Sequence, residues 1–241
     1  MKEKIDLLNG PVFSSLTRLA LPIMAPSLVQ MAYNLTDMIW IGRISSDAVA
    51  SVGAAGMYMW FANGIAVLAK MGGQVKVGHS LGAGEQAEAC GYARNAIQLS
   101  LFLGLLYGVL CFAFQQPLIG FFRLNSPAVI QDAQVYLALT CGLVVFSFLN
   151  QVFTGILTAM GNSRTSFLAT AVGLVINIVL DPVLIFGIGP FPKLLVAGAA
   201  IATVFAQAVV TAVFLLAVRT ESEIFLNLRF FTKPQLSILK E

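Results

Sequence analysis

Charged residues are spread so unevenly that they divide the chain into long apolar blocks. Six blocks hold one charge at most, at residues 19–36, 48–69, 95–122, 133–163, 165–192 and 194–218. A helix needs about 20 consecutive apolar residues to cross the hydrocarbon core of a bilayer. The blocks therefore predict six membrane-spanning helices, at roughly 16–42, 48–72, 95–114, 130–152, 165–187 and 196–218.

The composition agrees with a membrane protein and excludes several other classes. Of the 241 residues, 58% are hydrophobic and 10% are charged, whereas soluble domains average about 45–50% apolar and about 25% charged residues. A soluble enzyme, a nucleic-acid binder and a disordered chain do not fit these values. The apolar runs are continuous and do not alternate with polar positions, which favours helices over a transmembrane barrel.

We therefore expect an all-α integral membrane protein, a bundle of six transmembrane helices in residues 16–219. The segment Met160-Gly-Asn-Ser-Arg164 predicts the turn that ends the fourth span. Residues 1–15 are expected to form a cytoplasmic N-terminal segment, and residues 220–241 a cytoplasmic connector that leads from the bundle to a further part of the protein. Because no nucleophile–base set and no phosphate-binding loop occurs in the sequence, an enzymatic function is not expected.

Basic residues predict the orientation of the bundle. If the N-terminus is inside, 11 of the 14 Lys and Arg residues fall on the cytoplasmic side, and the other side receives Arg43, Arg123 and Lys193. Cytoplasmic loops carry an excess of Lys and Arg in membrane proteins. The sequence therefore predicts a multi-pass protein of the plasma membrane with both termini in the cytoplasm, in agreement with an even number of spans.

Two carboxylates interrupt the apolar spans. Asp37 lies five residues before Gly42 and Asp181 lies six residues before Gly187, so at 1.5 Å per residue both lie roughly 7–9 Å inside the same outer end. An ionisable residue within a membrane is unfavourable by about 2.5–3.5 kcal/mol on insertion scales and marks a functional site by default. The alternative for either residue alone is a helix cap near the outer headgroups.

Three more polar side chains reach the level of the two carboxylates. Asn177 precedes Asp181 by one helical turn and shares its face, while Thr203 and Tyr136 lie about seven residues into spans six and four. The five groups could share a proton or offer oxygen ligands to a hard cation. For Thr203 and Tyr136, an ordinary hydrogen bond between helices is an equally good interpretation.

Prolines mark the places where these helices can bend. Pro182 follows Asp181 directly and removes one backbone hydrogen bond from the fifth span. Pro22 and Pro26 do the same in the first span, a few turns from Asp37. Kinks of this kind are tolerated in membrane helices when neighbours satisfy the freed groups. A static kink and a bend that responds to a change of charge both fit the sequence.

Short motifs occur in a fixed order along essentially the whole chain. They are Leu19-Ala-Leu-Pro22, Tyr33-Asn-Leu-Thr-Asp-Met-Ile-Trp-Ile-Gly42, Val52-Gly53, Thr158-Ala-Met-Gly-Asn162, Asn177-Ile-Val-Leu-Asp-Pro-Val-Leu-Ile-Phe-Gly187, Gly198-Ala-Ala-Ile-Ala-Thr203 and Gln207. Each motif alone is weak. In this order and spacing, the series resembles the N-terminal lobe of a MATE (multidrug and toxic compound extrusion) transporter.

The resemblance implies a function and a set of site residues. It implies antiport, in which organic and often cationic compounds are exported while H⁺ or Na⁺ moves inward, with no cofactor beyond this coupling ion. It also implies that the first helix bends at Pro22. The residues that match the cation site of the N-terminal lobe are Asp37, Asn177, Asp181 and Thr203, with Tyr136 in their hydrogen-bond network.

The length of the chain sets its expected partners. The family has twelve spans in two six-helix lobes of the same orientation, whereas this sequence predicts six. Besides the lipid bilayer and a small organic substrate, we therefore expect a second six-helix lobe or a second copy in a parallel homodimer, and no nucleic acid. Two alternatives remain. One is a lipid or polysaccharide flippase of the same superfamily, although no Arg lies in the middle of a span, and the other is an inactive half-transporter or accessory membrane subunit.

The predicted orientation can be tested by labelling single cysteines in intact cells. A cysteine at position 193 should react with an impermeant thiol reagent added from outside, because Lys193 is assigned to an outer loop. A cysteine at position 164 should stay unlabelled until the membrane is opened, because Arg164 is assigned to the cytoplasm. The reverse result would contradict the orientation and every depth derived from it.

Overall fold

The computed structural model describes residues 34–221 and, before them, residues 24, 28, 29, 31 and 32. Residues 34–42 are helical. The helices that follow in this part of the chain are α2 (Ser46–Gly82), α3 (Gln86–Ala113), α4 (Gln115–Gly120), α5 (Pro127–Thr140), α6 (Val145–Ala159), α7 (Ser163–Phe186) and α8 (Leu195–Glu221). The described residues form no strand, so the predicted all-α class is confirmed. The predicted segment 1–15, almost all of the segment 220–241, Pro22 and Pro26 lie outside the described residues.

Most of the predicted spans correspond to helices of the structure. In the described part of the chain, α2, α3, α7 and α8 are each long and apolar enough to cross a membrane, and α5 with α6 adds a fifth span if this bent pair counts as one. The first predicted span, 16–42, lies mostly outside the described residues. The predicted turn between the fourth and fifth spans is confirmed, because α6 ends at Ala159 and α7 begins at Ser163.

The fourth span differs from the prediction, because two helices that meet at 45° replace one straight helix over 130–152. Gly142 lies in the break between α5 and α6, and a Cβ there would collide with the carbonyl of Ala138. The neighbouring α3 also approaches closely at Gly108, where a Cβ would lie 2.7 Å from the carbonyl oxygen of Gly142. The apolar pattern continues through the break, so it carries no sign of this crowding.

Helices α2 and α3 extend beyond the ends predicted near residues 72 and 95, because they continue to Gly82 and begin at Gln86. The limits of an uncharged block indicate where the apolar environment of the membrane ends. A helix can continue past this limit, and it ends where its backbone turns. Here the turn comes at Gly84, whose φ of 81° lies in the left-handed region that favours glycine.

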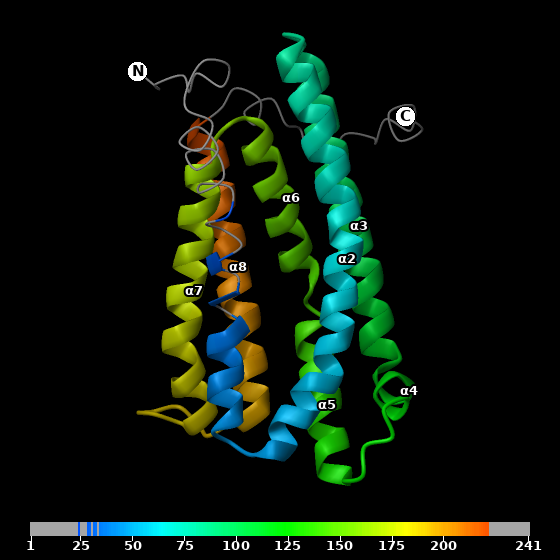
Figure 1. Ribbon diagram of the computed structural model, residues 1–241, viewed down its shortest axis with the longest axis vertical. Helices are drawn as coiled ribbons and strands as arrows, with labels where there is room; N and C mark the ends of the chain where they lie inside the picture. The colour runs from blue at the N-terminus through cyan, green and yellow to red at the C-terminus, as the bar shows by residue number, and fades with distance from the viewer. Residues whose placement is uncertain (1–23, 25–27, 30, 33, 222–241) are drawn as a thin grey trace, which may run out of the picture.

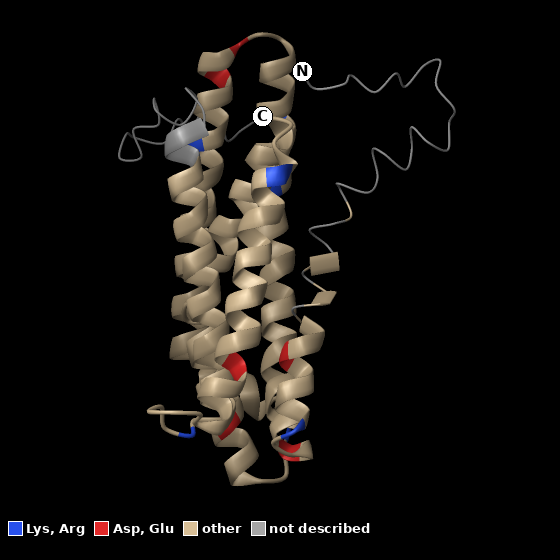
Figure 2. Ribbon diagram, turned by 90° about the vertical axis from the view of Figure 1, so that its left-hand side faces the viewer, with Lys and Arg blue, Asp and Glu red and all other residues tan. Residues whose placement is uncertain are grey.

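The broken pair α5–α6 lies at the centre of the bundle (Figure 1). Helix α2 packs against α3, α5 and α6, and α8 packs against α5, α6 and α7. Three loops, which contain Arg43, Arg123 and Lys193, lie at one end of the bundle (Figure 1). Figure 2 shows that the Lys and Arg residues of the described chain lie toward the two ends of the helices, with few near the middle. The predicted orientation depends on this division of the basic residues between the two ends of the bundle.

Glycines set the distance between α7 and α8. A Cβ on Gly173 of α7 would collide with Cγ2 of Val210, and a Cβ on Gly198 of α8 would lie against the Leu184 carbonyl. Small residues allow membrane helices to approach closely, and the resulting van der Waals contact is a main source of their association. The two helices are therefore held together at two points along their length, one on each side of Asn177 and Asp181.

The contact at Gly173 predicts a specific loss of stability. Gly173→Ala should destabilise the protein by about 1–3 kcal/mol, because the added methyl group overpacks the α7–α8 contact. Gly64→Ala is the matched control, since nothing lies within 4 Å of a Cβ at that helical position, and it should be neutral or stabilising by up to about 1 kcal/mol. Unfolding of both variants in mixed micelles provides the measurement, and equal effects would contradict the packing described here.

Candidate ion site

Helix α7 brings Asn177 and Asp181 together on one face. The helix continues through Pro182 and ends at Gly187, whose φ of 72° is left-handed and whose N–H donates to the Val183 carbonyl. Asn177 Nδ2 donates a hydrogen bond of 3.0 Å to Asp181 Oδ1. Both side chains have 0% exposure. The local geometry therefore agrees with the predicted pairing across one helical turn.

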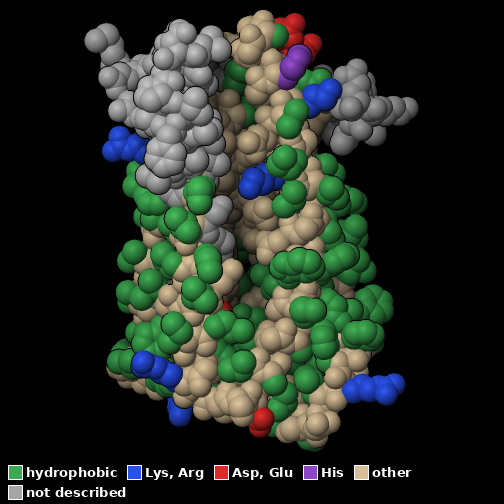
Figure 3. Space-filling view, viewed as in Figure 1, with side chains coloured by type: hydrophobic (Ala, Val, Ile, Leu, Met, Phe, Trp, Pro, Cys, Tyr) green, Lys and Arg blue, Asp and Glu red, His purple; other side chains and the backbone are tan. Residues whose placement is uncertain are grey.

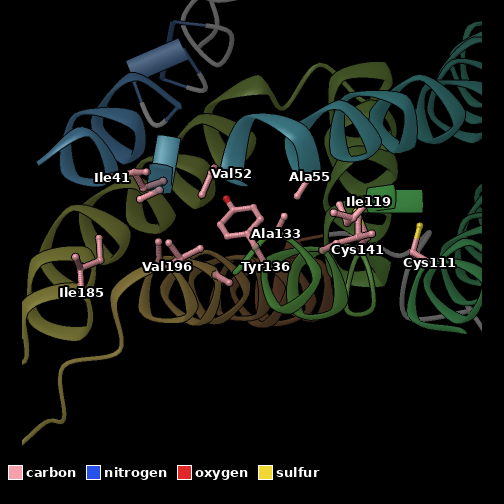
Figure 4. Packing of buried hydrophobic residues seen from close by; sticks show 14 residues of the cluster. Ile41, Val52, Ala55, Cys111, Ile119, Ala133, Tyr136, Cys141, Ile185 and Val196 are labelled. Atoms are coloured by element: carbon pink, nitrogen blue, oxygen red, sulfur yellow. The ribbon is translucent and has the colours of Figure 1, made fainter. Parts of the chain in front are cut away.

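Asp37 reaches the same place from the helical residues 34–42. Its side chain is 8% exposed, and its carboxylate lies close enough to that of Asp181 for the two charges to repel each other. Tyr136 of α5 is the hydrogen-bond partner of Asp37. Figure 4 shows the Tyr136 ring between α2 and α8, with its hydroxyl directed toward the side on which Ile41 and Val52 lie.

Four of the five predicted site residues thus form two hydrogen-bonded pairs, Asn177 with Asp181 and Asp37 with Tyr136. The fifth, Thr203, is buried at 8% exposure on α8, the helix that packs against both α7 and α5. The structure therefore gathers residues that are up to 166 positions apart in the sequence, from Asp37 to Thr203. It shows where these side chains lie, whereas their role in ion binding stays a prediction.

Three buried oxygens at this site lack a hydrogen-bond donor. They are Asp37 Oδ1, Asn177 Oδ1 and Asp181 Oδ2, none of which has a hydrogen-bond partner among the described residues. A buried acceptor without a donor is unfavourable by about 1–3 kcal/mol, and more when it is charged. A proton or a small hard cation would satisfy several of these oxygens at once. Within the described residues no three His, Cys, Asp or Glu side chains gather, so a bound cation would depend on amide and hydroxyl oxygens as well as the two carboxylates.

A second polar cluster joins α6 to α8. Asn150 Nδ2 donates to the backbone carbonyl of Gln207 at 3.0 Å and to its Oε1 at 2.8 Å. The Thr211 hydroxyl donates to Asn150 Oδ1 at 2.8 Å. Asn150 therefore forms hydrogen bonds between helices. The sequence did not lead us to predict that Thr211 belongs to this cluster. The spacing could have indicated it, because Thr203, Gln207 and Thr211 recur every four residues and so share one helical face.

A third polar contact lies on a more open face of the bundle. Gln151 Nε2 of α6 donates to Asn63 Oδ1 of α2 at 2.9 Å, and Asn63 is exposed. Figure 3 shows a narrow hollow along the side of α2 that faces α7, and hydrophobic side chains cover the outer faces of the molecule on both sides. Large exposed apolar faces mark surfaces that contact a membrane, another protein or a ligand.

Helices α2, α3, α7 and α8 are long and apolar enough to cross a membrane, and comparison with known proteins gives the family. The family model MatE matches residues 22–183, so the chain belongs to the MatE family. A relative from Thermotoga maritima, "Probable multidrug resistance protein NorM", is 31% identical over 193 residues, which cover 80% of this chain and 41% of that protein. An "FAD transporter" from Shewanella oneidensis is 29% identical over 207 residues, which cover 85% of this chain and 45% of that protein.

Solved structures agree with this assignment. A transporter of the MOP superfamily from Pyrococcus furiosus superimposes with a TM-score of 0.84 at 26% identity, and the match covers 100% of this chain and 52% of that one. The Shewanella oneidensis relative and the Pyrococcus furiosus protein are named as transporters, and the Thermotoga maritima relative is named as a probable multidrug resistance protein. The chain spans about half the length of the proteins it matches, which agrees with the expected single lobe.

The cluster between α6 and α8 predicts unequal effects for two adjacent residues. Asn150→Leu should destabilise the bundle by about 1–2 kcal/mol, because it removes hydrogen bonds between two membrane helices. Gln151→Leu should change stability by less than about 0.6 kcal/mol, because it loses a single bond to an exposed partner. Thermal unfolding of both variants in the same detergent tests this order, and a larger effect at position 151 would refute it.

Proposed function

We propose that this chain supplies the ion-binding lobe of an antiporter that exports organic, often cationic, compounds in exchange for H⁺ or Na⁺. The observation that carries the proposal is the group of unsatisfied oxygens on Asp37, Asn177 and Asp181, buried where no basic side chain among the described residues pairs with them. The family assignment and the multidrug resistance relatives support export as the direction of transport.

The site can bind one positive charge at a time. Two adjacent buried carboxylates repel each other unless a proton or a cation lies between them. A proton would be shared by Asp37 and Asp181, whereas Na⁺ would be coordinated by these carboxylates, by Asn177 Oδ1 and by Thr203. Tyr136 would hold the Asp37 carboxylate in place for either ion. Release of the ion restores the repulsion and so favours a different packing of the two helices.

The prolines connect the site to movement. Pro182 is adjacent to Asp181 within α7, so a change in charge acts on a helix that already lacks one backbone hydrogen bond. Pro22 and Pro26 would have the same effect in the first helix. An ion that binds one arrangement of the helices more tightly shifts the population toward it. The exported compound would bind in the hollow between α7 and α2 and respond to this shift.

The remaining partners follow from the size of the chain. A second six-helix lobe, or a second copy in a parallel homodimer, would complete the cavity. The protein would act in the plasma membrane with both termini in the cytoplasm. The FAD transporter among the relatives favours one alternative substrate class, a phosphate-bearing compound. A flippase and an inactive accessory subunit are the outcomes expected if no ion-driven export is found.

Replacing the acids should abolish ion coupling without unfolding the lobe. In vesicles that contain the protein with its second lobe or copy, Asp37→Asn and Asp181→Asn should each reduce ion-driven ethidium transport by about tenfold or more. The double variant should be no worse, because residues that act as a unit are not additive. Unfolding temperatures should change little, because Asn keeps the shape of Asp and no described basic residue loses a partner.

Asp132→Asn is the matched control, since Asp132 is an exposed acid on α5, and it should leave transport unchanged. Imposed gradients of H⁺ alone and Na⁺ alone, in separate vesicles, identify the coupling ion. Full transport by Asp181→Asn under all pH and Na⁺ conditions would show that the coupling site lies elsewhere.

A further inference from the structure

Polar side chains that the ion site does not use line the contact between α2 and α6. The first is the exposed pair of Asn63 and Gln151, joined at 2.9 Å. Two turns further along α2, the stem of Lys70 lies across α6 at Gly155, where a Cβ would be 3.0 Å from Lys70 Cγ and 3.1 Å from its carbonyl oxygen. A Cβ at position 155 would also lie 3.5 Å from Gln74 Cβ. Glycine at 155 therefore leaves the space through which Lys70 passes.

Lys70 carries a positive charge that the described structure does not neutralise. Its side chain is half-buried within the long apolar helix α2, and no charged group among the described residues acts on it appreciably. The next basic residue on α2, Lys76, lies over the ring of Tyr92 on α3 at 5.4 Å, so it is directed to a different neighbour. A partly buried, unpaired ammonium group is unfavourable, and an anionic group placed beside it offsets this cost.

Lys70 also lies apart from the two acids of the ion site. Asp37 is on the helical residues 34–42 and Asp181 is on α7, whereas Lys70 belongs to the contact between α2 and α6. Asp37 and Asp181 are buried, at 8% and 0% exposure, whereas Lys70 is half-buried, so Lys70 is more accessible to a bound compound than either acid.

We propose that Lys70 forms a subsite for the anionic group, a carboxylate or phosphate, of the compound that this protein binds. Asn63, Gln151 and Gln74 supply amide donors beside it. This inference rests on the proposed function, because it assigns the subsite to the exported compound. It predicts selectivity for zwitterionic or acidic compounds over purely cationic compounds of the same shape.

A matched pair of dyes tests this selectivity by binding alone. Rhodamine B carries a carboxylate and a positive xanthene ring, whereas its ethyl ester carries only the positive charge. Fluorescence anisotropy with the purified protein in neutral detergent gives a Kd for each dye without any ion gradient. Lys70→Gln should weaken binding of rhodamine B about tenfold, the scale of a lost charge-assisted hydrogen bond, and change the ester by less than about twofold. Lys70→Arg should keep the preference for rhodamine B.

Lys76→Gln is the control for loss of a positive charge on the same helix, and both dyes should bind it as they bind the unaltered protein. Unchanged ester binding by Lys70→Gln shows in the same assay that this variant is folded. Equal changes for the two dyes would overturn the subsite and leave the proposed function intact, whereas failure of the unaltered protein to bind either dye would overturn both. A preference for rhodamine B that disappears when phosphatidylglycerol is added would assign Lys70 to a lipid headgroup and overturn the proposal.

Discussion

The close approach of α7 and α8 is the contact on which the rest of this structure depends. Gly173 admits Val210 at one point and Gly198 admits the Leu184 backbone at another. Between these two points lie the polar residues of both helices, Asn177 and Asp181 on α7 and Thr203 and Gln207 on α8. A larger residue at either glycine would separate the helices and move the polar groups apart, so packing in the apolar contacts determines the geometry of the ion site.

The polar groups themselves fall into two kinds. Asn150, Gln207 and Thr211 satisfy one another and join α6 to α8 without a ligand. Asp37, Asn177 and Asp181 instead retain buried oxygens with no described donor. An unsatisfied buried acceptor destabilises a fold. The first cluster therefore stabilises the bundle, whereas the second destabilises it until an ion binds to its oxygens. This difference, more than the presence of acids in a span, distinguishes a site from a structural contact.

The broken helix α5–α6 connects these two clusters. Tyr136, which faces Asp37, lies on α5, and Asn150 lies on α6 beyond the break. Gly108 and Gly142 bring α3 against the break so closely that no side chain fits between them. The change of direction lets one span place a phenol at the ion site and an amide against α8. The same span offers Gln151 and Gly155 to α2, where Lys70 lies.

The sequence by itself determined the helical class, most of the spans and the identity of the candidate ligands. These follow from composition, from the length of uncharged blocks and from the height of Asp37 and Asp181 along their helices, which are all properties of one chain segment at a time. Only the tertiary structure decided the break at Gly142, the length of α2 and α3, the interhelical role of Asn150 and the placement of Lys70 across Gly155. Those features depend on which helices are neighbours and on how closely they pack. In a bundle whose helices are apolar on almost every face, hydrophobic periodicity does not reveal which helix packs against which.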